Sequence, residues 1–527
     1  MNTICKFADI DTYLLYFLNI KSIIILTTIS KDQYNHMFNL DFVKELRALK
    51  QKNRYFFEND VIDNAAKYNY ISLIKWVSYS INEFNYTSEA IDTAARGGYI
   101  DILNWFVTSP YEFKYSKGAI TRAAKNGQIE TLNWFAKSDY EFKYSKDAIV
   151  YAAKNRHINI LNWFVESEYK FKYTEDAVDL AAINGNTDVL TWFANSQYKF
   201  KYTENAINMA AKNGHIDVLN WFDNSEYEFK YLTCAIDYAA QNGNMDVLNW
   251  FDKSKYEFNY TSRAINTAAK NGHIHILNWF ADSDYEFNYS SNAINFAAEN
   301  GHIDVLNWFR DSEYEFEYTT KAIDGATKNG HINVLEWFVN SKYEFKYTTY
   351  AIDFAAGNGH IEILDWFEKS KYKFMYTKEA INIACLRNHL EILDWFDNSK
   401  YEFKYTEQAI ENACRYGHLE VLEWFDKSKY ELKYTEEAIN IGYISNYPEI
   451  LFWFDKSKYE LKYIRAINTA LCIHDVKILK WFDESKYEIK YNTETLKTVL
   501  QYDCTDIYNY LGPDSPTVKI LKEYAHA

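Results

Sequence analysis

The chain repeats one pattern of apolar and polar positions about every 29 residues. Fourteen tryptophans mark this period from Trp76 to Trp453 in steps of 29, and Trp481 follows after 28 residues. A pattern copied at this period is typical of repeat proteins, in which each unit buries its apolar face against its neighbours. The sequence therefore predicts one long array of about fifteen units, because an array can grow without splitting into globular domains.

Each unit predicts two short helices, as residues 203–231 show. Thr203 is a suitable N-cap for a first helix, helix A, and Gly214 supplies the left-handed turn that ends it. A wide apolar stripe that includes Trp221 then forms a second helix, helix B. Residues 227–231 alternate apolar and charged side chains, which favours an extended strap. We therefore expect an all-α helix-turn-helix solenoid with short straps between its repeats.

The run Ala206 to Phe222 resembles the core of the ankyrin repeat. The pairs Ala210-Ala211, Gly214-His215 and Val218-Leu219 match the family's A-A-x-x-G-H-x-x-V-V segment, and similar runs recur across residues 56–491. The sequence looks most like ankyrin-type proteins of giant DNA viruses of amoebae, which implies interaction with host proteins. Three features depart from the family: the T-P-L-H opening is absent, the glycine after helix B is missing, and the unit is shorter than the usual 33 residues or so.

The two ends of the chain depart from the period. Residues 1–50 weakly resemble an F-box, a module that recruits a ubiquitin-ligase core, although an N-terminal helical cap is the favoured interpretation. Residues 51–491 form the array, and 492–527 read as a degenerate capping repeat followed by a polar tail. The repeat around Pro448 lacks the Ala-Ala pair and the Gly-His junction, which makes it a candidate weak joint.

Composition narrows the class of function. The net charge of −16 argues against a general nucleic-acid binder. The most apolar N-terminal stretch, residues 13–29, is broken by polar side chains and fits neither a signal peptide nor a membrane span. Cys385 and Cys414 occupy the same position in adjacent repeats, too far apart for a disulfide, and are expected in the core. Together these features predict a cytoplasmic protein, in the host cytoplasm if the chain is viral.

Three columns of repeated residues could carry chemistry. Eight histidines share the position after the helix-A turn, but stacked copies lie about 8–10 Å apart, so hydrogen bonding to loop backbone is favoured over a metal site. The tryptophan column is assigned to the core. The residue before each tryptophan is mostly Asn and later Asp or Glu, which predicts a polar surface stripe or a weak contact with a basic partner. No catalytic or cofactor motif occurs, so no metal, cofactor or catalytic residue is predicted.

One position of helix A varies while its neighbours hardly change. We call it the 209 column; it reads Thr93, Arg122, Tyr151, Leu180, Met209, Tyr238, Thr267, Phe296, Gly325, Phe354, Ile383, Asn412, Ile441 and Thr469. In ankyrin proteins the matching position lies on the concave face that binds partners, so the resemblance implies a recognition surface here. The predicted contact residues are Tyr151, Leu180, Met209, Tyr238, Phe296 and Phe354, with Arg263, Lys321 and Tyr350 beside them. The alternative is that these side chains are partly buried between neighbouring A helices and vary by drift.

The sequence favours a non-enzymatic scaffold that binds a partner protein along helix A. The alternative is an adaptor whose residues 1–50 bind ubiquitin-ligase subunits while the repeats hold a substrate. An enzyme would require a pocket that breaks the repeat symmetry and gathers an acid, a base or a nucleophile.

Overall fold

The computed structural model describes residues 45, 48, 61–80, 84–502 and 504–526. Within them, helices are the only regular secondary structure, and turns and extended straps connect them. Two helices form each repeat, as the period predicts. The A helices are α4 (Val61–Lys67), α6 (Ser88–Gly97), α8 (Lys117–Lys125), α10 (Asp147–Lys154), α12 (Asp176–Ile183), α14 (Glu204–Lys212), α16 (Cys234–Gln241), α18 (Ser262–Lys270), α20 (Asn292–Glu299), α22 (Lys321–Lys328), α24 (Tyr350–Gly357), α26 (Glu379–Leu386), α28 (Glu407–Arg415), α30 (Glu436–Ile444), α32 (Ile464–Cys472) and α34 (Thr493–Val499).

The B helices alternate with the A helices along the chain. They are α5 (Ile71–Ser80), α7 (Ile100–Thr108), α9 (Ile129–Lys137), α11 (Ile158–Glu166), α13 (Thr187–Asn195), α15 (Ile216–Asp223), α17 (Met245–Lys253), α19 (Ile274–Asp282), α21 (Ile303–Asp311), α23 (Ile332–Asn340), α25 (Ile361–Lys369), α27 (Leu390–Asn398), α29 (Leu419–Lys427), α31 (Pro448–Lys456), α33 (Val476–Glu484) and α35 (Thr505–Leu511). A last helix, α36 (Pro516–His526), follows them.

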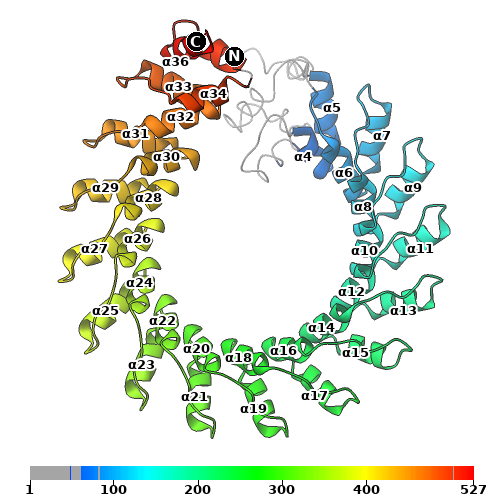
Figure 1. Ribbon diagram of the computed structural model, residues 1–527. Helices are drawn as coiled ribbons and strands as arrows, with labels where there is room; N and C mark the ends of the chain where they lie inside the picture. The colour runs from blue at the N-terminus through cyan, green and yellow to red at the C-terminus, as the bar shows by residue number, and fades with distance from the viewer. Residues whose placement is uncertain (1–44, 46–47, 49–60, 81–83, 503, 527) are drawn as a thin grey trace, which may run out of the picture. The chain divides into compact units, whose positions relative to one another are not determined.

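The chain divides into two compact units at residues 264 and 265, within α18. In each unit the A helices form one row and the B helices a second row (Figure 1). Successive A helices pack closely on one another, whereas successive B helices meet at few points. Because the B row is the more widely spaced, the A row lies on the concave side of each unit. The expected helix-turn-helix solenoid is thereby confirmed.

Local signals place the helix ends where the sequence predicts them. The Thr203 side chain accepts a hydrogen bond from the Asn205 N–H and caps α14. Gly214 has φ of 78° in the turn that follows α14. That left-handed conformation costs an L side chain about 1 kcal/mol or more, so glycine is favoured there.

Each repeat contributes the same apolar set to a continuous core. In residues 203–231, Ile207 and the two alanines 210 and 211 come from helix A, and Val218, Leu219 and Phe222 come from helix B; all are at most 1% exposed. Small side chains on one helix receive large ones from the other, which fills the layer without voids. Burial of a phenylalanine such as Phe222 stabilises the fold by about 1.5–3 kcal/mol.

The straps between repeats are extended but form no strand in the described residues. Their rings pack against the next repeat: Phe200 lies 4.1 Å from Tyr227 and 5.4 Å from Trp221, measured between ring centroids. The straps therefore tie consecutive repeats together through stacked rings.

The irregular repeat near Pro448 keeps the regular packing. Pro448 is at the start of α31, where its missing N–H costs nothing. Tyr443 replaces the second alanine of the pair and is 5% exposed, and its hydroxyl donates to Asp475 at 2.9 Å. Beyond this repeat, the segment expected as a polar tail contains α36, which buries Val518 and Leu521.

Candidate functional site

A ladder of mostly buried Asp and Asn side chains joins most A helices to the start of the next repeat. In unit 1, the Asp179 carboxylate accepts the Thr203 N–H at 2.8 Å and the Thr203 hydroxyl at 2.5 Å. In unit 2, Asn295 makes the same pair of bonds to Thr319, accepting its N–H at 2.9 Å and donating to its hydroxyl at 3.0 Å. Burial raises the pKa of Asp179 to about 6. These residues lie next to the 209 column, so they fix its backbone.

The tryptophan column is not fully buried, which corrects its assignment to the core. Apart from Trp76, which is 2% exposed, the tryptophans are half-buried on the B row. The Trp163 indole N–H donates to the Asn133 carbonyl at 2.7 Å, and its ring lies parallel to Phe142 at 5.5 Å. An indole must satisfy its N–H, so each ring lies at the edge of the core where a neighbouring repeat offers an acceptor.

The Asn column is a polar surface stripe, as predicted, since Asn104, Asn162 and Asn220 are exposed, but the same bond gives it a second role. Its amide oxygens accept the indole N–H of the next repeat, and Asp365 and Asp394 do so for Trp395 and Trp424 at 2.7 and 2.6 Å. The column is therefore part of the scaffold. Sequence reasoning missed it because donor and acceptor are 30 residues apart and belong to different repeats.

The histidine ladder lies over the glycine turns. In unit 2, a Cβ added to Gly330 would lie 2.8 Å from Nδ1 of His360, whose Nε2 bonds to the Lys328 carbonyl oxygen at 3.1 Å. His418 bonds the Leu386 carbonyl oxygen in the same way, which confirms the expected backbone role at both positions. No group of three or more potential metal ligands occurs in the part of the chain that the structure describes.

The predicted contact residues fall into two sets, one in each unit. Tyr151, Leu180, Met209 and Tyr238 lie in unit 1 and are half-buried, and so are Phe296 and Phe354 in unit 2. The flanking residues Arg263, Lys321 and Tyr350 are exposed, and Tyr350 exposes 57% of its surface. Half burial agrees in part with both interpretations of the column, because each side chain packs on the neighbouring A helix and still reaches the surface.

Cations border several rings of the 209 column. The ammonium of Lys125 lies 4.9 Å from the Tyr151 ring centroid. Tyr238 is flanked by Lys212 at 5.2 Å and by Arg263 at 5.3 Å. Such contacts stabilise by about 0.5–1 kcal/mol at exposed sites. In unit 1 the structure thus brings Arg263 and Tyr238 together, as predicted.

In unit 2 the flanking residue Tyr350 stacks on Phe354, with centroids 5.3 Å apart and planes at 16°. Lys270 covers the Phe296 ring at 5.5 Å. The column position between them is Gly325, so Lys321 lies exposed beside a position that has no side chain. The two aromatic members of this unit are therefore separated by one repeat.

The cysteines behave as core residues where the sequence predicts it. Cys385 and Cys414 are buried and free, and burial raises the pKa of both thiols. A protonated, buried thiol is a poor nucleophile. Neither residue contributes to a reactive site.

The ankyrin resemblance has independent support. Residues 236–322 match the family model of ankyrin repeats, described as three copies. Over these residues the chain is similar to ankyrin repeats. No curated protein matches it. Ankyrin repeats indicate a scaffold for protein–protein interaction, and their helical fold is typically non-enzymatic.

Residues 1–50, predicted as an F-box-like segment or a cap, lie almost wholly outside the described residues.

No described helix is both long and apolar enough to span a bilayer. The longest has 11 residues, whereas about 20 are needed.

Proposed function

We propose that the 209 column of each unit binds a partner protein. The supporting observation is the contrast between this column and its neighbours within the same helix. The position before it is mostly a buried Asp or Asn, and the position after it is a fully buried alanine in nearly every repeat. Most side chains of the column are instead half-buried, and they range from Gly325 to Tyr238. A position that the scaffold leaves free, on the concave side of a row of helices, is suited to specify a partner.

The side chains of the column have the chemistry of interface anchors. Tyr, Phe, Met and Arg are enriched in protein interfaces, and a few aromatic residues there supply most of the binding energy. A lysine or arginine lies over the half-buried ring of each of Tyr151, Tyr238 and Phe296. We therefore propose a partner that places apolar side chains on these rings and carboxylates on the bordering cations.

The test replaces Tyr151, Tyr238, Phe296 and Phe354 by Ser in the full-length protein. We expect this variant to lose partner capture from an amoebal lysate, quantified by mass spectrometry against wild type, while its melting temperature falls by only a few degrees. The matched control replaces the exposed B-row valines Val107, Val165 and Val339 by Ser, and it should capture the same proteins as wild type. A large loss of stability in the four-ring variant would place these rings in the core and end the proposal.

The adaptor function is the alternative, and a deletion separates the two. Full-length protein and a variant without residues 1–50 are used as parallel baits. If both recover the same partners through the repeats, residues 1–50 act as a cap. Ubiquitin-ligase subunits that are recovered with the full chain and lost with the deletion would support the adaptor, with the 209 column as its substrate site.

A further inference from the structure

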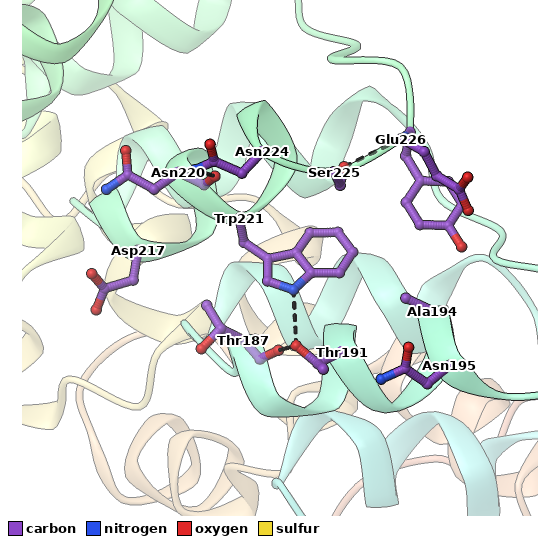
Figure 2. A pocket seen from close by; sticks show the side chains of 11 residues that line it. Thr187, Thr191, Ala194, Asn195, Asp217, Asn220, Trp221, Asn224, Ser225 and Glu226 are labelled. Carbon is purple, nitrogen blue, oxygen red and sulfur yellow. Dashed lines mark hydrogen bonds between the residues drawn. The ribbon is translucent and has the colours of Figure 1, made fainter.

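A second candidate site lies on the other face of unit 1, between the B helices α13 and α15. A groove of about 560 Å³ opens there over the half-buried indole of Trp221. Figure 2 shows Thr187 and Thr191 of α13 beneath the indole, Asp217 of α15 to one side and Glu226 of the following turn to the other. The groove is therefore an aromatic surface with a carboxylate at each end.

Grooves of this kind recur along the B row, and one of about 470 Å³ lies between α11 and α13, beside Ile158 and Asn162. Helix α13 departs from the repeat on the side that faces Trp221. Positions 187 and 191 lie one turn apart on one face of the helix, and both are Thr. The neighbouring B helix α11 has Ile158 and Asn162 at these positions, and among the other B helices only the degenerate last one has a Thr at either position, Thr505. Thr187 is smaller than the Ile of α11 and leaves more space beside Trp221. This is a local break in the repeat symmetry, and sequence comparison of the repeats contains its signal.

Most polar groups of the groove are already satisfied within the protein. The Trp221 indole N–H donates to the Thr191 hydroxyl at 2.9 Å, and that hydroxyl donates to the Thr187 carbonyl oxygen at 2.9 Å. Asn220 accepts the Trp250 indole N–H at 2.7 Å. By contrast, the exposed carboxylates of Asp217 and Glu226 make no ion pair or hydrogen bond among the described residues. The groups left for a ligand are therefore acceptors that carry negative charge.

The equivalent position between the next two B helices of the same unit is occupied by a lysine of the chain itself. Between α15 and α17, the Lys255 ammonium lies 2.9 Å from the Asp223 carboxylate and 5.2 Å from the Tyr256 ring centroid. The chain itself thus supplies a cation to that groove. In the groove between α13 and α15, the equivalent of Lys255 is Glu226 and the equivalent of Asp223 is Ala194. Here the cation is missing and its position is acidic.

We propose that this groove binds arginine or lysine side chains of a basic peptide segment from a partner protein. Ionised carboxylates accept charge-assisted hydrogen bonds from guanidinium or ammonium groups, and a cation over an indole face gains a further attraction. A guanidinium suits the site best because it can stack on the ring and bond a carboxylate at the same time.

The spacing of the two carboxylates sets the spacing of the cations. Asp217 lies on α15, which ends at Asp223, and Glu226 lies three residues beyond that end. Six helical steps span about 9 Å and three further residues at most about 10 Å, so the two Cα atoms are at most about 19 Å apart. In an extended peptide, two basic residues four positions apart are separated by about 13 Å. Their long side chains cover the remaining distance to both carboxylates, with the chain between them crossing Trp221.

The test measures fluorescence anisotropy of a labelled nine-residue Gly/Ser peptide with arginines at positions 3 and 7. The protein is the full chain at low ionic strength. The control peptide has citrulline at both positions, which keeps the shape and removes the charge. We expect saturable binding of the arginine peptide and at least tenfold weaker binding of the citrulline peptide.

Two variants probe the groove. The substitution Thr187→Trp places a large ring beside Trp221 and fills the groove. Glu226→Lys introduces the residue that seven other repeats carry there, namely Lys255, Lys342, Lys371, Lys400, Lys429, Lys458 and Lys486. We expect each to weaken the peptide at least tenfold. The matched control, Glu168→Lys, makes the same charge change at the equivalent position of the repeat that contains α11, and should change binding less than twofold.

Several outcomes would overturn the proposal. Absence of binding, or unchanged binding to the filled groove, would exclude this site. Equal losses with Glu168→Lys and Glu226→Lys would show diffuse attraction to an acidic protein. Binding of a neutral oligosaccharide in place of the peptide, abolished by filling the groove, would assign the indole to sugar stacking instead. The four-ring variant of the 209 column keeps the groove intact, so failure of either site can be told from failure of the other.

Discussion

The side chain of Asn295 offers a direct measure of how strongly one repeat holds the next. It is 2% exposed on α20 and makes two hydrogen bonds, of 2.9 and 3.0 Å, to Thr319, the residue that opens the following repeat. Thr319 in turn accepts the N–H of Lys321 in the first turn of α22. Asn295→Ala therefore removes both bonds and leaves a main-chain N–H without its acceptor.

The expected cost follows from those two bonds. Each is worth about 0.5–1.5 kcal/mol, and a part-buried N–H left unpaired adds a desolvation penalty, so we expect about 2 kcal/mol in total. Asn295→Asp is the matched control, because Asp324 binds Thr348 with two contacts of 2.8 Å at the equivalent position of the next repeat. That change should cost less than about 1 kcal/mol.

Hydrogen exchange is the suitable assay, since a repeat array opens locally and has no single unfolding free energy. A loss of about 2 kcal/mol should speed exchange of the α20 and α22 amides by roughly 30-fold, at about 1.4 kcal/mol per factor of ten. The distant helix α32 should exchange as in wild type. Unchanged exchange in α22, or an equal acceleration in α32, would refute the view that this bond pair clamps neighbouring repeats.

Three further predictions use other parts of the scaffold. Burial raises the pKa of Asp179 to about 6 from an ordinary value of 3.8, so the folded state holds this proton more tightly than the unfolded state, and stability falls as pH rises from about 4 to 6. Asp179→Asn, which supplies the residue found at position 208, should remove this contribution. The melting temperature of the variant minus that of wild type should therefore rise between pH 4 and 7. A difference in melting temperature that stays constant over this range would contradict the raised pKa. Gly330→Ala should destabilise unit 2 by about 1–2 kcal/mol, because φ is 75° and the new Cβ meets His360. Adding His360→Ala should recover the loss caused by the clash with the imidazole but not the loss caused by the left-handed backbone. A double-mutant cycle of thermal unfolding measures both contributions. EDTA or added Zn²⁺ should shift the melting temperature by less than about 1 °C, since stacked histidines about 8–10 Å apart cannot share an ion; a clear stabilisation by Zn²⁺ would contradict this spacing.

The period of the sequence predicts the helices because their ends are set within one repeat. Thr203 caps α14 through the N–H two residues later, and Gly214 turns the chain at the end of the same helix. The apolar spacing likewise identifies Ile207 and Phe222 as core, and both are at most 1% exposed. Everything that depends on neighbours within about four residues was therefore predictable.

Contacts between repeats could not be predicted because their sequence separations differ. Trp163 reaches an acceptor 30 residues earlier, Thr203 one 24 residues earlier, and His360 one 32 residues earlier. These offsets follow from how one helix pair is displaced on the next, which a single repeat does not encode. The Trp and Asn columns were therefore assigned separate roles although they bond to each other.

The candidate sites show the same limit. Comparison of repeats identifies the 209 column as variable, but only the close spacing of the A helices shows that its side chains are half-buried. Thr187 and Thr191 differ in sequence from the usual Ile and Asn, yet the groove itself follows from the wider spacing of the B row, since a similar groove lies beside Ile158 and Asn162. Substitutions become informative once the distance to the facing helix is known.

Different positions of the repeat maintain the fold and vary at the surface, so one array can carry variable surfaces without losing its fold. The buried apolar set, the Asp/Asn ladder and the indole bonds recur in most repeats, and they join each repeat to its neighbours. The 209 column lies outside these recurring sets, and at the same position of three different A helices it accommodates Arg122, Met209 and Gly325. Because stability lies in the recurring positions, we expect the proposed binding positions of the column to tolerate substitution at little cost to folding. Substitutions there should therefore alter binding far more than the melting temperature, whereas substitutions in the ladder should do the opposite.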